Sequence, residues 1–408
     1  MKIAVIGLGI SGMGAAYILK QNGHDVTCFE KNDYIGGHSR TIEVEGTPID
    51  TGFIVFNYRN YPNLTALFDK LQVPVEKSDM SFSASINGTW LEYGTQNTAA
   101  VFAQKRNLLR PKFIKMLRDI FKFNAEATKY ADSNITLGEC LDKLGMSDWF
   151  KKYYLLAMGG AIWSTPLGKM LDFPARTFIK FFDNHGLLTT NDQPQWFTVS
   201  GGSREYVKRL TASYADSIKL DSNIKQITRQ NGKVQIDGEE FDHVFFGCHS
   251  DQALKMLADI TLLEQQIIGS FKYQENQIYV HSDEKFMPSN IKCWASWVYK
   301  IEGKDDIQPQ ISLSYYMNRL QNLKIAKPII VTLNPSKKPQ NIHNEYVFEH
   351  PVFDEGAIAA QDKITALQGQ NNTWFMGAYQ RYGFHEDGLL SAVNACKAFG
   401  ATIPWEAN

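Results

Sequence analysis

The segment Ile3-Ala-Val-Ile-Gly7-Leu-Gly9-Ile-Ser-Gly12 decides the fold of this chain. Its apolar start predicts a short buried strand, and Met13–Gln21 follows with a helical pattern. A second predicted strand, Val26–Glu30, comes next. In this strand, turn, helix and strand context, the first glycine permits a tight turn, the second lets a pyrophosphate approach the backbone, and the third lets helix and strand pack closely. The sequence therefore predicts an α/β fold with a Rossmann-like dinucleotide-binding unit.

Glu30 ends the second predicted strand, 18 residues after Gly12. A carboxylate at this point can accept hydrogen bonds from both hydroxyls of an adenosine ribose and would repel a 2′-phosphate, so NADP is disfavoured. The chain contains one such glycine motif. Enzymes that pass electrons from NAD(P)H to FAD within one chain commonly carry two, so we expect the electrons to come from the substrate. Oxygen, a quinone or a protein remain open as the acceptor.

The composition excludes several classes of protein. The 408 residues are 44% hydrophobic and 21% charged, with 42 Lys+Arg and 43 Asp+Glu, so the formal charge of -1 gives no general field for nucleic acid. Five scattered cysteines without a CxxC pair predict neither a disulfide framework nor a metal site. The longest apolar stretch, Tyr153–Trp163, is too short to span a bilayer, and no secretory signal is expected at Met1. We therefore expect a cytoplasmic protein.

A second glycine-rich segment, Gly36-Gly37-His38-Ser39-Arg40, is followed by Gly52-Phe53. With the first motif, it resembles the FAD-binding amine oxidase superfamily, which includes monoamine oxidase, protoporphyrinogen oxidase and phytoene desaturase. In that superfamily, a Gly-Gly pair followed by an arginine wraps the FAD pyrophosphate. Here a histidine follows the glycines and the arginine comes two places later, so the residue that faces the phosphates is left open. The resemblance implies FAD as the cofactor.

The superfamily interleaves a Rossmann-like FAD-binding domain with an α+β substrate domain, as in other FAD proteins of the glutathione-reductase type. This chain can be divided in the same way. The FAD-binding domain would comprise residues 1–70, 200–262 and 350–408, and the substrate-binding domain residues 71–199 and 263–349.

Two later segments continue the resemblance. The pattern from Asp221 to Gly247 is typical of strands and a hairpin, and the family places the equivalent of Ile224 against the adenine. A predicted strand before Gly377 leads to a helix over Gly388–Gly400, whose N-terminus would stabilise negative charge on the flavin. Ala378 stands where the family usually has an acidic residue. The implied cofactor-binding residues are Gly7, Gly9, Ile10, Ser11, Gly12, Glu30, Lys31, Gly36, Gly37, His38, Ser39, Arg40, Gly52, Phe53, Ile224, Gly377, Ala378, Gly388 and Leu389.

His385 and Glu386 immediately precede the predicted C-terminal helix, so they are the first candidates for catalysis. We expect hydride removal from an activated allylic position to flavin N5, with His385 or Glu386 taking a proton from the neighbouring carbon. The alternative is that both residues only cap the helix and hold the ribityl chain of the flavin. Tyr273 is a further candidate, and Lys272 could correspond to the lysine that many amine oxidases place beside N5.

The blocks Phe271–Asp283, Trp294–Trp297 and Arg381–Gly388 narrow the resemblance to a bacterial subgroup similar to the N-terminal oxidase-like domain of plant cyclopropane fatty acid synthases. That subgroup implies oxidation or desaturation of a modified or unsaturated acyl lipid, with an acyl-chain methyltransferase as a partner. One alternative is a flavin amine oxidase acting on a small amine or polyamine. Another is a non-catalytic flavoprotein that assists the methyltransferase.

Two remaining patterns have two interpretations each. Aromatic residues crowd 149–200, where they form either an ordinary helical core or an apolar tunnel for a long substrate. Residues 105–122 carry seven cations and one acid, interleaved with apolar residues. They predict an amphipathic helix, started or kinked by Pro111, that either lies on an anionic membrane surface or presents a solvated basic face.

Overall fold

A five-stranded parallel sheet carries the first glycine motif. In the computed structural model, which describes residues 1–163, 170–184, 186–188, 193–302 and 310–406, its strand order is β10-β2-β1-β14-β20. The strands are β1 (Lys2–Ile6), β2 (Asp25–Phe29), β10 (Ile218–Lys219), β14 (His243–Phe246) and β20 (Thr373–Phe375). All five come from the segments assigned to the FAD-binding domain. The boundaries of the two predicted domains stay a prediction.

Both faces of this sheet are covered, which explains why β1 is apolar throughout rather than alternating. Ile3 and Val5 pack in a core with α1 (Ile10–Gln21) and α15 (His385–Phe399). Ala4 and Ile6 face a second core on the opposite side. That core is closed by further short elements, which are β11 (Ile227–Gln230), β12 (Lys233–Ile236), β13 (Glu239–Phe241), α11 (Ser250–Met256), α12 (Leu262–Ile268) and α14 (Glu355–Gln361).

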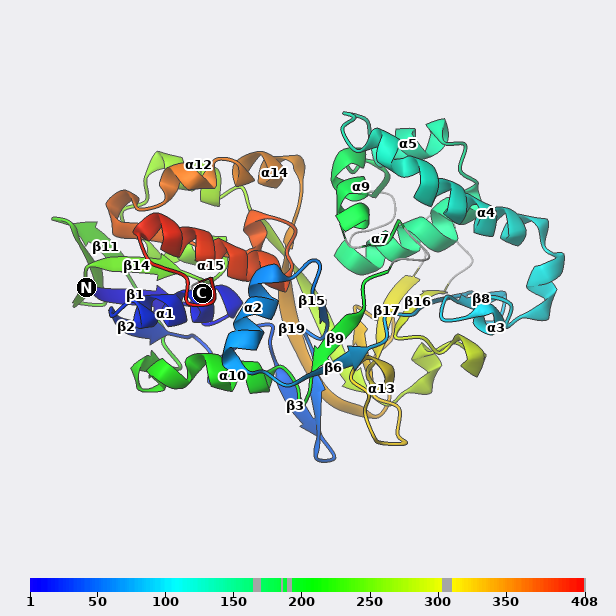
Figure 1. Cartoon of the computed structure of the whole chain (residues 1–408), viewed down its shortest axis with the longest axis horizontal. Helices are drawn as coiled ribbons and strands as arrows, with labels where there is room; N and C mark the ends of the chain where they lie inside the picture. The colour runs from blue at the N-terminus through cyan, green and yellow to red at the C-terminus, as the bar shows by residue number, and fades with distance from the viewer. Residues whose placement is uncertain (164–169, 185, 189–192, 303–309, 407–408) are drawn as a thin grey trace.

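A seven-stranded mixed sheet forms the base of the other lobe (Figure 1). Its order is β19-β15-β18-β17-β16-β7-β8, and β16 and β7 are the parallel neighbours. The strands are β7 (Phe82–Ile86), β8 (Leu91–Gly94), β15 (Lys272–His281), β16 (Trp297–Glu302), β17 (Gln310–Tyr316), β18 (Ile330–Leu333) and β19 (Ile342–Val352). The long β15 and β19 pair side by side and extend toward the FAD-binding lobe (Figure 1).

Helices pack above this sheet and bury the aromatic residues of the region. They are α4 (Pro111–Glu126), α5 (Leu137–Lys143), α6 (Asp148–Phe150), α7 (Leu156–Trp163) and α9 (Ala175–Asn184). Phe150, Phe178 and Phe182 are fully buried in their common core, as the interpretation as a helical core predicted. The side chain of Trp163 lies outside the described residues.

Further short elements complete the two lobes and the region between them. They are β3 (Thr41–Val44), β4 (Thr47–Asp50), β5 (Phe56–Asn57), α2 (Pro62–Leu71), β6 (Val75–Ser78), α3 (Thr98–Val101), β9 (Trp196–Val199), α10 (Arg204–Thr211) and α13 (Met317–Leu320). The α/β fold with a Rossmann-like unit is confirmed.

Three local predictions need adjustment or completion. The C-terminal helix begins at His385, three residues before Gly388, so the candidate catalytic residues lie in its first turn. Residues 221–226 are a connection rather than a strand. Pro111 is the first residue of α4 and does not kink it, because its fixed φ suits the first helical position. Among the described residues, no helix is long and apolar enough to cross a membrane.

Candidate active site

The turn between β1 and α1 has room for a side chain at only one of its three motif glycines. A Cβ at Gly12 would lie 1.8 Å from the Gly7 carbonyl oxygen, and one at Gly7, where φ is 85°, would lie 2.8 Å from the Cys248 nitrogen. A Cβ at Gly9 would meet nothing within 4 Å. Gly9 caps α1 without a side-chain hydrogen bond, so the first N–H groups of the helix face open space.

Glu30 lies beside this turn at the end of β2. Its carboxylate is buried and accepts hydrogen bonds from the Leu8 N–H at 2.7 Å and from the Asn32 N–H at 3.0 Å. The Ser222 N–H donates to the Glu30 carbonyl at 2.8 Å, which brings the connection containing Ile224 to the same place. Lys31 is exposed. The residues predicted to contact the ribose, the adenine and the pyrophosphate come from distant segments. The hydrogen bonds of Glu30 bring them into one region of the structure.

The second glycine segment packs directly on the first. The Gly36 N–H donates to the Leu8 carbonyl at 2.8 Å, and a Cβ at Gly37, where φ is 58°, would lie 3.1 Å from the Gly9 Cα. Arg40 is half-buried, with its guanidinium 4.3 Å from the centre of the Tyr346 ring. The loop thus closes over the start of α1 through its backbone.

The start of α15 touches the start of α1. The Ser11 hydroxyl donates to the Gly388 carbonyl at 2.9 Å, and a Cβ at Gly388 would lie 2.8 Å from the Ile10 Cγ2 atom. Leu389 is buried in the same interface, whereas the Gly377 N–H donates to the Ser391 hydroxyl at 2.8 Å. Ala378 lies near Gly388, because a Cβ at that glycine would be 3.8 Å from the Ala378 Cβ. The two helix N-termini therefore converge, as the sequence predicted.

His385 occupies the first turn of α15 and faces the second glycine segment. Its ring stacks on Phe53 at 4.0 Å between centroids, and its Nε2 atom is 2.7 Å from the Tyr206 hydroxyl and 3.2 Å from the Ser39 hydroxyl. Burial lowers the pKa of His385 to about 3. Gly52 is required nearby, because a Cβ there would lie 2.2 Å from the His38 carbonyl oxygen.

Glu386 does not point into the same space. Its carboxylate accepts hydrogen bonds from the Asn63 N–H at 3.0 Å, the Asn63 side-chain amide at 2.7 Å and the Leu64 N–H at 2.9 Å. It therefore caps the N-terminus of α2, and burial raises its pKa. The structure does not present Glu386 as a free base. The helix that Glu386 caps is α2, and not the C-terminal helix that the alternative interpretation named.

The candidates on β15 separate from one another. Lys272 forms an ion pair of 2.9 Å with Asp354, and 71% of its side chain is exposed. The structure thus corrects its expected place beside the flavin ring. Tyr273 stacks on His249 at 4.2 Å, and its hydroxyl accepts the Ser250 N–H at 2.9 Å. Farther along β15, Asn276 is fully buried, and its side-chain amide lies 3.0 Å from the His350 Nδ1 atom.

The sequence of this chain matches a family of flavin-containing proteins. Residues 10–307 match the model of the family described as flavin containing amine oxidoreductase. The chain belongs to this family. As a member of this amine oxidoreductase family, the protein is a FAD-dependent oxidoreductase.

Known structures share the fold at low sequence identity. A CLA-producing fatty acid isomerase from P. acnes matches with a TM-score of 0.70 and 18% identity, over 97% of this chain and 98% of that one. Cyclohexylamine oxidase from Brevibacterium oxydans matches with a TM-score of 0.67 and 14% identity, over 98% and 99% of the chains. A 4,4′-diapophytoene desaturase from Staphylococcus aureus is 46% identical over 52 residues, which span 13% of this chain and 10% of the desaturase.

The residues of this family member fit FAD. The first turn of α1 is open at Gly9, and Glu30 has a position suited to ribose hydroxyls. The Nε2 atom of His38 is inaccessible to solvent and has no hydrogen-bond partner within the described part of the chain. A buried polar atom of this kind is costly unless a ligand satisfies it. These glycines, Glu30 and His38 are the residues that would hold the dinucleotide.

Four of the nine histidines gather around this site, which the sequence did not predict in full. The His38 ring is 5.3 Å from His350 and 4.4 Å from Phe348, both on β19. Burial lowers the pKa of His38, and it lowers that of His249 and of His350 to about 4. His249 lies in the turn just after β14, so its place at the carboxyl edge of the sheet was a usable signal. The pairing of β19 with β15 brings His350 to the site. No pattern in the sequence around His350 predicts this position.

Proposed function

We propose that this oxidoreductase oxidises or desaturates an uncharged acyl chain. The observation that carries the proposal is the neutral and aromatic character of the wall at the start of α15. Burial lowers the pKa of His38, His249, His350 and His385, so these rings are uncharged at neutral pH. The carboxylates of Glu386 and Asp387 accept hydrogen bonds from backbone N–H groups. Such a wall suits a greasy chain better than a cation.

Aromatic contacts extend this wall into the substrate lobe. Phe384, just before His385, stacks on Phe181 of α9 at 5.1 Å, and Tyr382 is 6.1 Å from the same ring. Both Phe384 and Tyr382 pack against the aromatic core beneath α4 and α9. A long apolar substrate that reached the start of α15 would therefore meet aromatic rings along its length.

Bound FAD would supply the two-electron acceptor. The protein's own part is to hold the chain, exclude water and move a proton. The hydrogen-bonded series Ser39, Tyr206 and His385 is the candidate for the proton, because its neutral imidazole is linked to two hydroxyl groups. The hydrogen bond between the Ser39 and Tyr206 hydroxyls completes the series.

The similarities support both an acyl substrate and an amine. The solved isomerase is named for a fatty acid, the curated desaturase for diapophytoene, and cyclohexylamine oxidase for an amine. The acyl-chain methyltransferase inferred from the sequence remains a proposed partner. The amine alternative is therefore part of the test.

The test is anaerobic reduction of the purified FAD-loaded protein. We expect unsaturated or methyl-branched acyl lipids to bleach the flavin absorbance, and aliphatic amines and polyamines to leave it oxidised. Bleaching by amines alone would overturn the acyl proposal.

A pair of matched variants examines the aromatic wall itself. Phe384→Ala should weaken reduction by long acyl chains more than by short ones, because the lost ring contacts only the longer substrates. Phe286→Ala is the control, since this ring packs on His281 elsewhere in the same lobe. Equal effects of the two substitutions would argue against the proposed path.

A further inference from the structure

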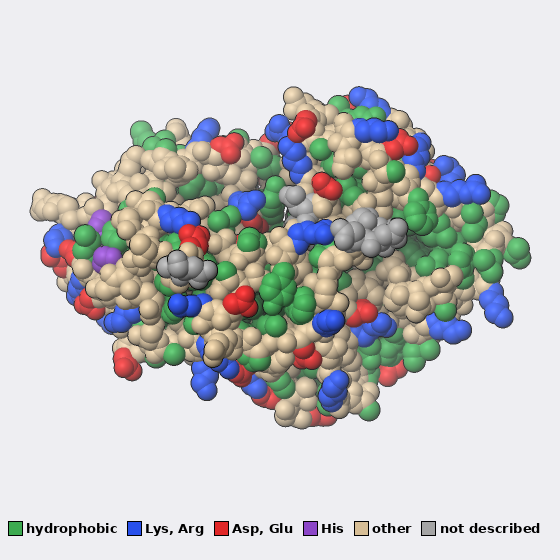
Figure 2. Space-filling model, in the orientation of Figure 1, with side chains coloured by type: hydrophobic (Ala, Val, Ile, Leu, Met, Phe, Trp, Pro, Cys, Tyr) green, Lys and Arg blue, Asp and Glu red, His purple; other side chains and the backbone are tan. Residues whose placement is uncertain are grey.

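A surface at the far end of the substrate lobe combines protruding apolar side chains with cations. Leu109 is 87% exposed and Leu108 is 54% exposed in the turn Lys105–Leu109, and Phe121 of α4 is 63% exposed. Figure 2 shows hydrophobic side chains gathered at this end of the molecule, with cations at their border. Large aliphatic side chains are seldom presented so fully to water without a partner.

The opposite face of α4 explains why this side of the helix is left outside. Phe113, Met116 and Phe123 are buried at helical spacing and hold α4 on the aromatic core. Lys115, Arg118 and Lys122 therefore fall on the outer side, together with Phe121. The exposed residues are fixed in place by the buried ones, so they form a rigid surface.

Most of the cations on this surface form no ion pair with an acid among the described residues. Arg106 and Arg110 are held by the Trp90 carbonyl, at 2.9 and 2.8 Å. Within the ranges that the structure describes, Lys105, Lys112 and Arg118 take part in no ion pair. A surplus of positive charge therefore faces outward.

The single acid of the segment offsets one of these cations. Asp119 is buried, and it accepts hydrogen bonds from the Ser147 N–H at 3.0 Å and from Lys115 at 3.1 Å. It also lines the groove on this surface, where its carboxylate forms an ion pair with Lys115. The cations left to an anionic partner are therefore chiefly Lys112 and Arg118.

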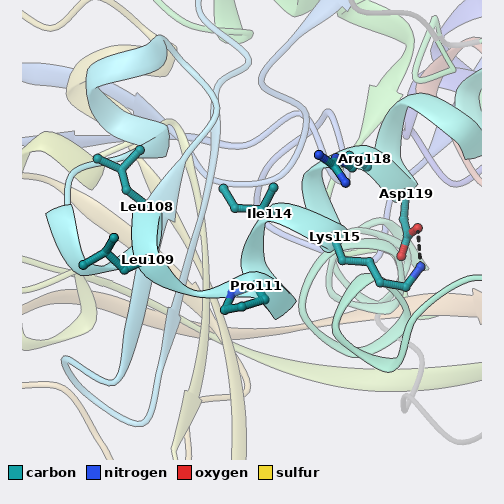
Figure 3. A pocket seen from close by; sticks show the side chains of 7 residues that line it. All are labelled: Leu108, Leu109, Pro111, Ile114, Lys115, Arg118 and Asp119. Atoms are coloured by element: carbon teal, nitrogen blue, oxygen red, sulfur yellow. Dashed lines mark hydrogen bonds and ion pairs between the residues drawn. The ribbon is translucent and has the colours of Figure 1, made fainter.

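A shallow groove of about 460 Å³ links the apolar and the charged parts. Figure 3 shows Leu108 and Leu109 toward one end of the groove, and Lys115, Arg118 and Asp119 toward the other. Pro111 and Ile114 lie between them. The apolar end is suited to acyl chains, and the cationic end to their anionic headgroups.

We propose that this surface, formed by Leu108, Leu109, Phe121, Lys112 and Arg118 and called here the α4 surface, docks on a lipid bilayer that contains anionic headgroups. Cations bind such headgroups, and protruding aliphatic and aromatic side chains insert into the boundary between headgroups and acyl chains. Binding to nucleic acid phosphates would use the cations but would give Leu108 and Leu109 no apolar environment. The proposal stands whether or not the substrate is an acyl lipid.

The first experiment is flotation of the FAD-loaded full chain with vesicles. We expect binding to phosphatidylcholine vesicles that contain phosphatidylglycerol, and little binding to phosphatidylcholine alone. Raising the salt concentration should weaken binding, because salt screens exposed charges. Absence of binding to the anionic vesicles at low salt would overturn the proposal.

Two double variants separate the charged from the apolar contribution. Lys112→Gln with Arg118→Gln should weaken vesicle binding by about 30-fold, which corresponds to about 1 kcal/mol for each cation. Leu108→Ser with Leu109→Ser should weaken it by about tenfold or more, because the inserted apolar area is lost. The matched controls are Lys208→Gln with Lys363→Gln, and Leu262→Ser, which alter exposed residues of the FAD-binding lobe. Equal losses in the controls would overturn the proposal.

Insertion is measured directly with a polarity-sensitive dye on Leu109→Cys. Its emission should shift to the blue on anionic vesicles, and the same dye on Leu262→Cys should not respond. A response to free DNA or to soluble phosphate, with no shift on vesicles, would show that the cations serve another anion and would overturn docking on lipid.

Discussion

The two ends of the cofactor site are built from different kinds of contact. Around Gly7, Gly9 and Gly12, backbone approaches backbone, and the residues that matter are close in sequence. Around His385, side chains from distant segments stack and share hydrogen bonds, including Phe53 and Tyr206. The first end is set by local conformation and the second by tertiary packing. Substitutions of the tightly packed glycines at the first end should therefore affect folding, and those of the hydrogen-bonded side chains around His385 should affect chemistry.

The sharpest test of the first end compares two glycines in one motif. Gly12→Ala should destabilise the protein by about 3 kcal/mol or prevent folding, because the new Cβ meets the Gly7 carbonyl. Replacing glycine by alanine normally stabilises a helix. A loss of stability in Gly12→Ala would therefore show that the clash with Gly7 outweighs this preference. Thermal unfolding of the FAD-free protein measures this effect.

Gly9→Ala is the matched control at the same turn. Its Cβ has open space and its φ is -71°, so the stability of the FAD-free protein should change by less than about 1 kcal/mol. FAD affinity should nevertheless fall by about tenfold, since the methyl group lies where a phosphate would approach the backbone. Equal destabilisation by both alanines would contradict the distinct roles of these glycines.

At the second end, His385→Phe keeps a ring against Phe53 but removes the imidazole. We expect turnover to fall about 100-fold, with little loss of bound FAD, because a proton-transfer group is missing. Tyr206→Phe should give a smaller loss and should shift the pH profile, since it removes one hydrogen-bond partner of the imidazole. Stopped-flow reduction of the flavin measures both. Unchanged turnover in His385→Phe would remove this histidine from the chemistry.

Glu386 provides a contrast one residue away. Glu386→Ala should lower stability by about 2 kcal/mol, because it leaves the Asn63 and Leu64 N–H groups without their acceptor. Glu386→Gln keeps an acceptor and should lower stability less. Once folded, both variants should reduce the flavin at nearly the normal rate. A large loss of turnover in the stable Gln variant would restore Glu386 as a base.

The sequence predicted the first end well because its signals are local. A strand, three spaced glycines and a terminal carboxylate are visible within residues 3–30, and their roles follow from backbone geometry. The same reasoning misplaced Lys272, because a residue at the beginning of a long strand can lie on the surface while Asn276 turns inward. It also missed His350, which reaches His38 through strand pairing between segments far apart in the chain. Such contacts leave no pattern in a single sequence.

The histidines also predict how stability depends on pH. Those at the second end have folded pKa values below 6.5, so the unfolded chain binds more protons as the pH falls. Stability should therefore decrease from about pH 6.5 toward pH 4, by at most about 1.4 kcal/mol per pH unit for each histidine.

Asp50 acts in the opposite direction over part of this range. Burial raises its pKa to about 6, so the folded state keeps a proton that the unfolded state loses above its usual pKa of 3.8. Burial also raises the pKa of Glu386 and of Asp387, so the three acids together offset part of the effect of the histidines. Denaturant unfolding between pH 4 and 7 measures the slope, which His385→Phe should reduce. A flat profile would contradict the lowered pKa values.

The smallest effect is expected at Lys272. Its ion pair with Asp354 is exposed, and such pairs contribute from about 0 to 1 kcal/mol, so Lys272→Ala should be nearly neutral for stability. Flavin reduction and reoxidation by oxygen should also be unchanged, because the ammonium group lies on the surface. Asn276→Ala is the informative comparison on the same strand, since it empties a buried position that contacts His350. If Lys272→Ala slowed reoxidation and Asn276→Ala did not, the lysine would reach the flavin. The second end of the site would then include the beginning of β15.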